Sequence, residues 1–299
     1  MYLGIEIGGT KLQLALGEAN GSLNALWRGT VNAAEGGEGI RRAIVAAVPD
    51  LLANAGTDRG QLRGVGVGFG GPTDDASQSV IKSHHIEGWT GFPLAKWLSD
   101  LLSLPTVICN DADVACLGEA LHGAGAGLSP VFYITVGTGI GGGLVIDGEI
   151  YRGCGRGATE IGHLIMPDGE ILESSSAGWG IEARAKRDPL LQDRKYTVKD
   201  LAAAARAGIA AAKEHLDFAT LQLAEGIRQV IKLLCPRRIV IGGGVSLMGD
   251  DLFFTPLRKH LAEHEFPPFA GLTDVVPAAL GEEVVLHGAL ALAKRSFER

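Results

Sequence analysis

Glycine gathers at the ends of short apolar segments, and this feature most constrains how the chain can fold. Of 299 residues 44 are glycine, and the clusters Gly8-Gly9, Gly70-Gly71 and Gly242–Gly244 each follow a β-branched, apolar run. Glycine permits positive φ angles and close approach of the backbone to another group. The clusters therefore predict turns built around a ligand, although a tight hairpin would give the same pattern at any one of them.

Composition excludes several classes of protein. The chain is 46% hydrophobic, with a net charge of −7 and a pI near 5.6. It can bury a large core, and it lacks the basic face that binds nucleic acid. No apolar run approaches the ~20 residues that span a bilayer, and no basic leader opens the chain, so we expect a cytoplasmic protein without membrane contact. The four cysteines form no CxxC pair and are typical of small buried hydrophobes.

Apolar periodicity predicts an α/β protein with mixed sheets, because paired strands come first and alternate with helices later. Strands are predicted at Leu3–Ile7, Leu12–Leu16, Gly64–Gly68, Thr106–Ile108, Val131–Thr135, Gly143–Ile146 and Arg238–Ile241. Helices are predicted at Gly39–Ala55, Pro93–Ser103, Asp113–His122, Val198–Ala212, Asp217–Leu234, Leu252–Glu263 and Glu283–Arg295.

One pattern occurs twice. The segments Leu3–Gly17 and Val131–Gly148 both read as strand, glycine turn and strand, followed by more strand and then helix. Two similar halves could face one another across a cleft. We therefore expect an N-terminal lobe of residues 1–115 with 283–299, and a C-terminal lobe of residues 116–282.

The second of these turns, Gly137–Gly142, satisfies the GxGxxG pattern of dinucleotide-binding proteins. That pattern requires a helix directly after the glycines, and here a strand is predicted instead, which excludes the dinucleotide site. Backbone amides of a glycine hairpin can still bind phosphate, with the hydroxyls of Thr135 and Thr138 as further donors.

The first turn carries charge. Glu6 precedes Gly8 and Gly9, and Thr10 and Lys11 follow. A carboxylate here can hold Mg²⁺ through water, while the hydroxyl and the ammonium donate to phosphate oxygens. An ordinary hairpin with an exposed lysine remains the alternative.

Asn110-Asp111-Ala112-Asp113 lies between a predicted strand and a predicted helix. Asn or Asp at such a position is a natural N-cap of the helix. One carboxylate could instead be a general base that accepts the proton of a hydroxyl attacking phosphorus. The local pattern leaves both interpretations open.

A polar patch, Glu160, His163 and Glu173, interrupts an apolar stretch. Two carboxylates and an imidazole can bind neighbouring sugar hydroxyls, although a solvated loop is the alternative. A single histidine does not make a zinc site. Further on, Gly243 and Gly244 end a predicted strand, where the backbone could lie against an adenosine or simply turn into a helix.

In this order, the motifs resemble the ROK family of bacterial sugar kinases and sugar-responsive repressors, over nearly the whole chain. The resemblance implies the two-lobed, actin-like, hexokinase-type ATPase fold, a duplicated ribonuclease H-like architecture. It implies transfer of the γ-phosphate of MgATP to a hydroxyl of a hexose such as glucose, fructose or an N-acetylhexosamine. We expect a homodimer.

The resemblance also implies roles for individual residues. Asp111 would be catalytic, and Glu6 would hold Mg²⁺ through water. The sugar would contact Gly71, His85, Asn110, Asp111, Glu160, His163 and Glu173. The nucleotide would contact Glu6, Gly8, Gly9, Thr10, Lys11, Thr135, Gly137, Thr138, Gly139, Gly243 and Gly244.

Three positions depart from the family pattern. Glu6 stands where most members have aspartate, and His85 replaces an asparagine that usually touches the sugar. The cysteine-rich zinc segment is missing between His163 and Glu173, so no structural zinc is expected. These departures keep open a non-catalytic sugar sensor of the same family. A kinase that forms acyl phosphates would lack the Glu160, His163 and Glu173 set.

Overall fold

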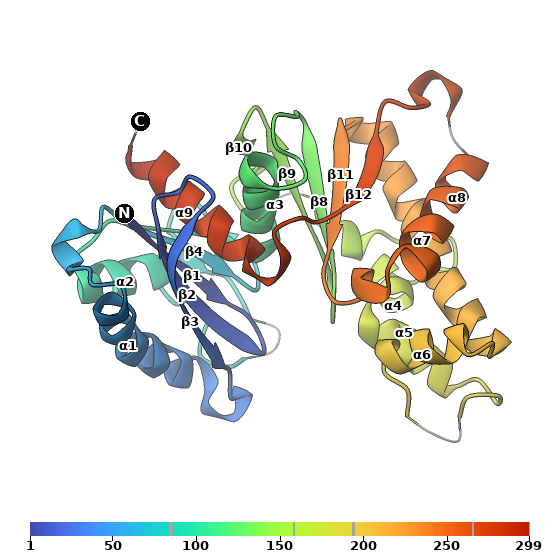
Figure 1. The fold of residues 1–299 in the computed structure, drawn as a ribbon, viewed down its shortest axis with the longest axis horizontal. Coiled ribbons are helices and arrows are strands. Elements are labelled where there is room, and N and C mark those ends of the chain that lie inside the picture. The colour runs from blue at the N-terminus through green and yellow to red at the C-terminus, as the bar shows by residue number, and fades with distance from the viewer. Residues whose placement is uncertain (84–85, 158, 193–194, 265, 299) are drawn as a thin grey trace. The chain divides into compact units, whose positions relative to one another are not determined.

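The computed structural model describes residues 1–83, 86–157, 159–192, 195–264 and 266–298. Within them the chain forms two five-stranded mixed sheets with helices packed against them (Figure 1). The first sheet contains β1 (Tyr2–Ile7), β2 (Lys11–Gly17), β3 (Leu23–Thr30), β4 (Val65–Phe69) and β7 (Thr106–Asn110). The second contains β8 (Val131–Val136), β9 (Ile140–Ile146), β10 (Glu149–Ile150), β11 (Arg238–Gly242) and β12 (Asp274–Pro277).

Shorter elements and helices complete the fold. A two-stranded sheet pairs β5 (Thr73–Asp74) with β6 (Ser79–Val80). The helices are α1 (Gly36–Asn54), α2 (Leu94–Leu102), α3 (Asp111–His122), α4 (Leu172–Ser176), α5 (Gly178–Lys186), α6 (Val198–Arg206), α7 (Ala210–Leu234), α8 (Thr255–Glu263) and α9 (Val284–Phe297). No helix in these ranges is long and apolar enough to cross a membrane.

The first sheet has the strand order β3-β2-β1-β4-β7. β1 runs antiparallel to β2 and parallel to β4, and β4 runs parallel to β7. Leu3, Ile5 and Ile7 of β1 pack into an apolar core with residues of α1 and α2 on one face of the sheet. α3 and α9 cover the other face (Figure 1).

Glycine allows α9 to pack closely on that second face. A Cβ placed on Gly66 of β4 would collide with the backbone oxygen of Ala289, and one on Gly4 of β1 would lie 3.2 Å from that of Leu286. Any larger side chain would push the helix away from the strands. The glycines of these strands thus serve packing as well as turns.

The second sheet repeats the plan of the first. Its order is β10-β9-β8-β11-β12, with β11 parallel to both β8 and β12. In each sheet the first three strands in the sequence lie next to one another. Two later strands add to the sheet beside the first of them and run parallel to it: β4 and β7 beside β1, and β11 and β12 beside β8. This repeat agrees with the one predicted from the segments Leu3–Gly17 and Val131–Gly148.

The chain divides into two compact units. Unit 1 comprises Met1–Gly127, Gly143–Ala158 and Ala279–Arg299, and unit 2 comprises Leu128–Gly142 and Thr159–Ala278. The boundary predicted between residues 115 and 116 falls inside α3, which lies wholly in unit 1. The two predicted lobes stay a prediction.

Several elements differ from the sequence prediction. The helix predicted over Val198–Ala212 ends at Arg206, because Gly208 has a φ of +90° that a right-handed helix does not tolerate. α7 consequently begins at Ala210, before the predicted start at Asp217. β3, β12, α4 and α5 were not predicted. β3 contains no buried residue, and Leu26 interrupts its alternation of apolar and polar residues, so its sequence carries only a weak strand signal.

Candidate functional site

Three parallel strands of unit 1 end side by side. Ile7 of β1 pairs with Phe69 of β4, which pairs with Asn110 of β7. The residues that follow these strand ends are Gly8, Gly70 and Asp111. Ligands of α/β proteins bind beyond the carboxyl ends of parallel strands. The register thus brings two of the glycine turns and the predicted catalytic carboxylate to one edge of the sheet.

Gly70 shows how close these groups lie. A Cβ placed on it would be 3.4 Å from Asp111 Oδ2, 3.5 Å from Gly8 Cα and 3.3 Å from the backbone oxygen of Ile7. Its own amide donates to that oxygen at 2.8 Å. Any side chain at position 70 would therefore occupy the space between Asp111 and the turn at Gly8.

Asn110 caps α3. Its Oδ1 accepts hydrogen bonds from the amides of Ala112 at 2.9 Å and Asp113 at 3.3 Å, and its Nδ2 donates to the backbone oxygen of Gly71 at 3.1 Å. The capping role that the sequence left open thus falls to Asn110. Asp111 is the first residue of the helix, half-buried, with Oδ1 accepting from the amide of Ala112 at 2.8 Å.

Glu6 is buried, with one charged and one neutral hydrogen-bond donor beside its carboxylate. Its oxygens lie 3.0 Å from Lys11 Nζ and 2.9 Å from Gln13 Nε2, and only 5% of the residue is exposed. Burial raises the pKa of Glu6, although Lys11 and Gln13 counteract part of this effect. Lys11 also donates to the backbone oxygen of Glu282 at 3.2 Å. The carboxylate and the ammonium predicted to serve phosphate transfer therefore neutralise each other here.

Unit 2 repeats the strand-end arrangement. Thr135 of β8 pairs with Gly242 of β11, so Gly137 and Gly243 follow neighbouring parallel strand ends. Gly243 has a φ of +88°, and a Cβ on it would lie 2.5 Å from the backbone oxygen of Val136. Only glycine fits this position without strain. As predicted, a strand and not a helix follows the turn at Gly137–Gly139.

Glu173 contacts this turn directly. Its Oε2 accepts the amide of Ile140 at 2.8 Å, and a Cβ on Gly139 would lie 2.6 Å from the same oxygen. Glu173 comes from α4, so the solvated loop that the sequence left as the alternative is a short helix at this point. The carboxylate therefore supports the glycine turn, whether or not it also contacts a sugar.

Glu160 and His163 are exposed neighbours in unit 2. Their side chains are 60% and 63% exposed, and His163 Nδ1 lies 3.5 Å from Glu160 Oε2. A 3-10 turn, Ile161–His163, presents them, with Ile161 and Gly162 buried beneath. Two polar groups held together and open to solvent are available to hydrogen-bond a polyol.

The remaining predicted site residues lie in turns, except for His85. Gly9, Thr10, Thr138 and Gly244 are exposed. His85 lies outside the described residues. Sequence reasoning missed Gln13 and Arg152, which contact predicted site residues or their neighbours. Gln13 is a lone polar residue in an apolar strand, which is the signal that could have identified it.

Among the residues with described positions, no group of three or more His, Cys, Asp and Glu side chains could hold a metal ion. Glu6 alone would have to hold Mg²⁺ through water, as its predicted role requires.

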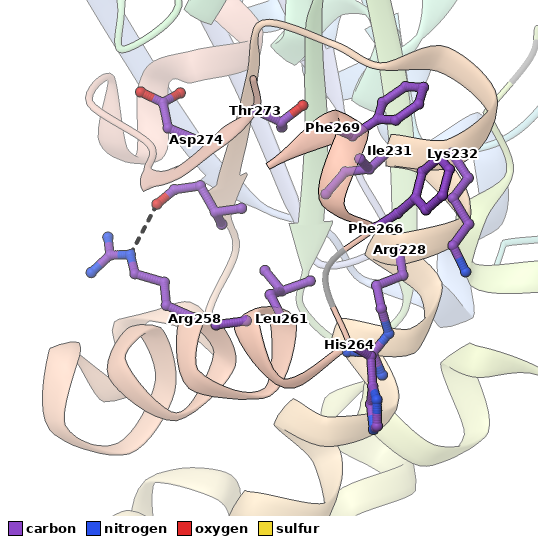
Figure 2. A pocket seen from close by; sticks show the side chains of 12 residues that line it. Arg228, Ile231, Lys232, Arg258, Leu261, His264, Phe266, Phe269, Thr273 and Asp274 are labelled. Carbon is purple, nitrogen blue, oxygen red and sulfur yellow. Dashed lines mark hydrogen bonds between the residues drawn. The ribbon is translucent and has the colours of Figure 1, made fainter. Parts of the chain in front are cut away.

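Unit 2 also has a cavity of about 300 Å³ (Figure 2). Residues of α7, α8 and β12 line it, together with Phe266 and Phe269, whose rings stack 5.4 Å apart. Val275, which lines it, pairs with Ile239 near the beginning of β11, whereas Gly243 and Gly244 follow the end of that strand. No predicted site residue is among those that line the cavity.

Comparison with known proteins identifies the family. A glucokinase of Halalkalibacterium halodurans is 31% identical, over 98% of this chain and 95% of the relative. The ROK hexokinase of Thermus thermophilus superposes with a TM-score of 0.86 at 28% identity, covering 99% of this chain and 98% of that one. A ROK glucokinase of Streptomyces griseus, solved with glucose and AMPPNP, gives 0.79 at 30% identity, covering 98% and 99%.

These neighbours confirm the predicted fold class, the actin-like ATPase fold with mixed sheets. A family model described as the ROK family matches residues 2–296. The resemblance inferred from the motifs thus extends over the whole chain, which belongs to the ROK family.

Proposed function

We propose that this protein is an ATP-dependent sugar kinase that transfers the γ-phosphate of MgATP to a hydroxyl of a hexose. The observation that carries the proposal is the meeting of Asp111, Gly70 and Gly8 at three parallel strand ends of unit 1. Relatives named glucokinase and hexokinase support the same activity, and one of them was solved with glucose and an ATP analogue.

Asp111 would accept the proton of the attacking hydroxyl. The hydroxyl oxygen forms a bond to the γ-phosphorus while the bond from that phosphorus to the bridging oxygen breaks, and ADP leaves. Asp111 lies in the first turn of α3, where the helix dipole favours a negatively charged group. Asn110 and Gly71, joined by a hydrogen bond beside it, would contact the same sugar.

The two glycine turns would bind the phosphates. The turn at Gly8–Lys11 offers backbone amides, the Thr10 hydroxyl and the Lys11 ammonium. The turn at Gly137–Gly139 offers amides with the hydroxyls of Thr135 and Thr138. Such donors stabilise charge that develops on the transferred group. Gly243 and Gly244 would lie against the adenosine, and Glu160, His163 and Glu173 would bind sugar hydroxyls.

Magnesium would be held by Glu6 through water, and it would neutralise charge on the phosphates when bound. The fit is supported by a buried carboxylate whose only close cation is Lys11 among the residues of the described ranges. Lys11 would have to turn from Glu6 toward phosphate oxygens, and its side chain is 42% exposed, which leaves it room to do so.

The proposal also covers the location of the protein in the cell and its oligomeric state. We infer a cytoplasmic homodimer that binds sugar and ATP but neither nucleic acid nor membrane, and that needs no structural zinc. A sugar sensor without catalysis is the alternative, favoured by Glu6 in place of the usual aspartate.

A coupled assay of ADP release tests the proposal against a panel of hexoses, ketohexoses and N-acetyl amino sugars. We expect one or more sugars to accelerate ADP release well above the rate with ATP alone, with the sugar phosphate found by mass spectrometry. Binding of sugar without any sugar phosphate would favour the sensor instead.

A further inference from the structure

Arg152 joins three segments of unit 1 that are distant in sequence. It follows β10, and its guanidinium contacts the segment after β5 and the first turn of α3. Nε donates to both oxygens of Asp75, at 2.9 and 3.0 Å, and Nη2 donates to Asp75 Oδ1 at 2.6 Å and Thr73 Oγ1 at 3.2 Å. Nη1 forms an ion pair with Asp113.

These charges are largely shielded from water. The side chain of Arg152 is 14% exposed and that of Asp113 2%, and Thr73 is fully buried. Breaking a buried ion pair is strongly destabilising, and the guanidinium supplies the positive charge beside Asp113. Gly157 closes over the pair: it has a φ of +98°, and a Cβ on it would lie 3.6 Å from both Arg152 Nη1 and Asp113 Oδ2.

The segments that Arg152 joins carry the residues proposed for catalysis. Asp113 lies two residues after Asp111 in the same helical turn, and Asp75 lies four residues after Gly71. Asn110 connects the two segments a second time through its hydrogen bond to the Gly71 backbone oxygen. Segments 71–75 and 110–113 are therefore tied at two places, and Asp111 lies between the ties along the chain.

We propose that Arg152 is a positioning residue that holds the first turn of α3 against segment 71–75, so that the Asp111 carboxylate stays directed at the acceptor hydroxyl. The inference rests on the proposed function for its effect on catalysis, but the positioning itself does not. A displacement of about 1 Å at a reacting group can lower a rate by roughly 10²-fold.

Arginine suits this task better than lysine would. Its planar guanidinium presents five donors in fixed directions, and here it serves two carboxylates and a hydroxyl at once. An ammonium could neutralise Asp113 but could not hold Asp75 and Thr73 in the same geometry.

The test compares Arg152→Met and Arg152→Lys with a matched control, Arg228→Met. Arg228 in α7 is similarly buried, at 6% exposure, and donates to Glu225 and to the backbone oxygen of His260. It lines the cavity of Figure 2, and no predicted site residue is among those that line this cavity. Steady-state kinetics and amide hydrogen exchange are measured on all variants and the wild type.

For Arg152→Met we expect kcat to fall by about 10²-fold, with KM for MgATP within about twofold of the wild type. Exchange at residues 110–113 becomes faster, because the first turn of α3 opens more often. Arg152→Lys regains thermal stability but not kcat. Arg228→Met loses stability and keeps both kcat and the protection of residues 110–113.

Two results overturn the inference: unchanged protection of residues 110–113 in Arg152→Met, or the same loss of kcat in Arg228→Met. If wild-type protein phosphorylates no hexose, the proposed function fails, and hydrogen exchange still decides whether Arg152 positions the turn.

Discussion

The carboxylate of Glu6 is buried, and two neighbouring side chains stabilise it there. Lys11 and Gln13 each contact one of its oxygens, which offsets part of the cost of removing a carboxylate from water. The offset is incomplete, because burial still raises the pKa of Glu6 above its usual 4.5. The residue that would hold Mg²⁺ is thus a source of strain in the folded protein when it is ionised.

Replacing Glu6 with Gln should change how stability depends on pH. The folded wild type holds a proton on Glu6 at a pH where the unfolded chain has released it, so its stability falls as pH rises above 4.5 and through the folded pKa. The Glu6→Gln variant has no carboxyl group at this position, so its stability does not decrease for this reason. Urea unfolding of both proteins at several pH values between 4 and 7 measures the difference in unfolding free energy.

In that series the wild type should lose stability relative to Glu6→Gln as pH rises. A wild type that gains stability relative to the variant would show that Lys11 and Gln13 outweigh burial. Glu38→Gln provides the control, since Glu38 is exposed on α1 and pairs only with Arg42 in the described structure.

Among the elements, the turn after β11 depends on one glycine and not on its neighbour. Gly243 has a φ of +88° and lies against the backbone of Val136, whereas a Cβ on Gly244 would meet no described atom within 4 Å. Gly243→Ala should lower the free energy of unfolding by about 1–3 kcal/mol and weaken ATP binding. Gly244→Ala should do neither by a comparable amount. Urea unfolding and nucleotide titration measure both.

Equal effects of the two alanine substitutions would contradict this account of the turn. Strain at position 243 and open space at position 244 are the physical basis of the comparison.

The packing of α3 on α9 includes two histidines that resist protonation. Burial lowers the pKa of His122 and of His287 below 6.5, helped by the charge of Lys294 for His122 and of His122 for His287. His122 Nε2 and His287 Nδ1 are buried and accept no hydrogen bond from the described chain. The unfolded chain therefore binds protons more readily than the folded protein as pH falls below 6.5.

We expect the wild type to lose stability as pH falls through this range, and His287→Gln to lose less. Unfolding by urea at pH 7.5 and pH 5.5 gives the difference for each protein. His264→Gln, at an exposed position of unit 2, serves as control and should follow the wild type. A slope in His287→Gln as steep as in the wild type would rule out this histidine as a cause.

At the scale of the whole molecule, the sequence predicted the fold class, the family and the strand ends that carry the glycine turns. Those features are local: apolar runs such as Leu3–Ile7, then glycines, then polar residues. The carboxyl ends of β1, β4 and β7 lie at the same edge of the sheet because these strands are parallel. The sequence predicted the strands but not their parallel pairing.

Other features could not be predicted because they arise from contacts between distant residues. Arg152 is one of two arginines in a glycine-rich stretch, and its partners Asp75 and Asp113 are brought to it only by the fold. Glu173 was predicted to bind sugar, but its contact with Ile140 depends on α4, whose five residues carry too little periodicity to recognise. The role of each predicted site residue stays a proposal.

Metal removal should leave the whole molecule folded. No group of three or more His, Cys, Asp and Glu side chains that could hold an ion occurs among the described residues, and we predict that metal binding adds nothing to the folding free energy. Treatment with EDTA should leave the melting temperature unchanged, and metal analysis should find no stoichiometric zinc. A large drop in melting temperature, or one zinc per chain, would refute this.

The most direct test of the central claim is the turnover number of Asp111→Ala with the best sugar of the panel. General-base catalysis is worth roughly 10²–10⁴-fold, so kcat should fall by at least about 10²-fold. Asp100→Ala, which removes an exposed carboxylate of α2, should leave kcat unchanged. A kcat for Asp111→Ala close to that of the wild type would contradict the claim that Asp111 accepts the proton of the sugar hydroxyl.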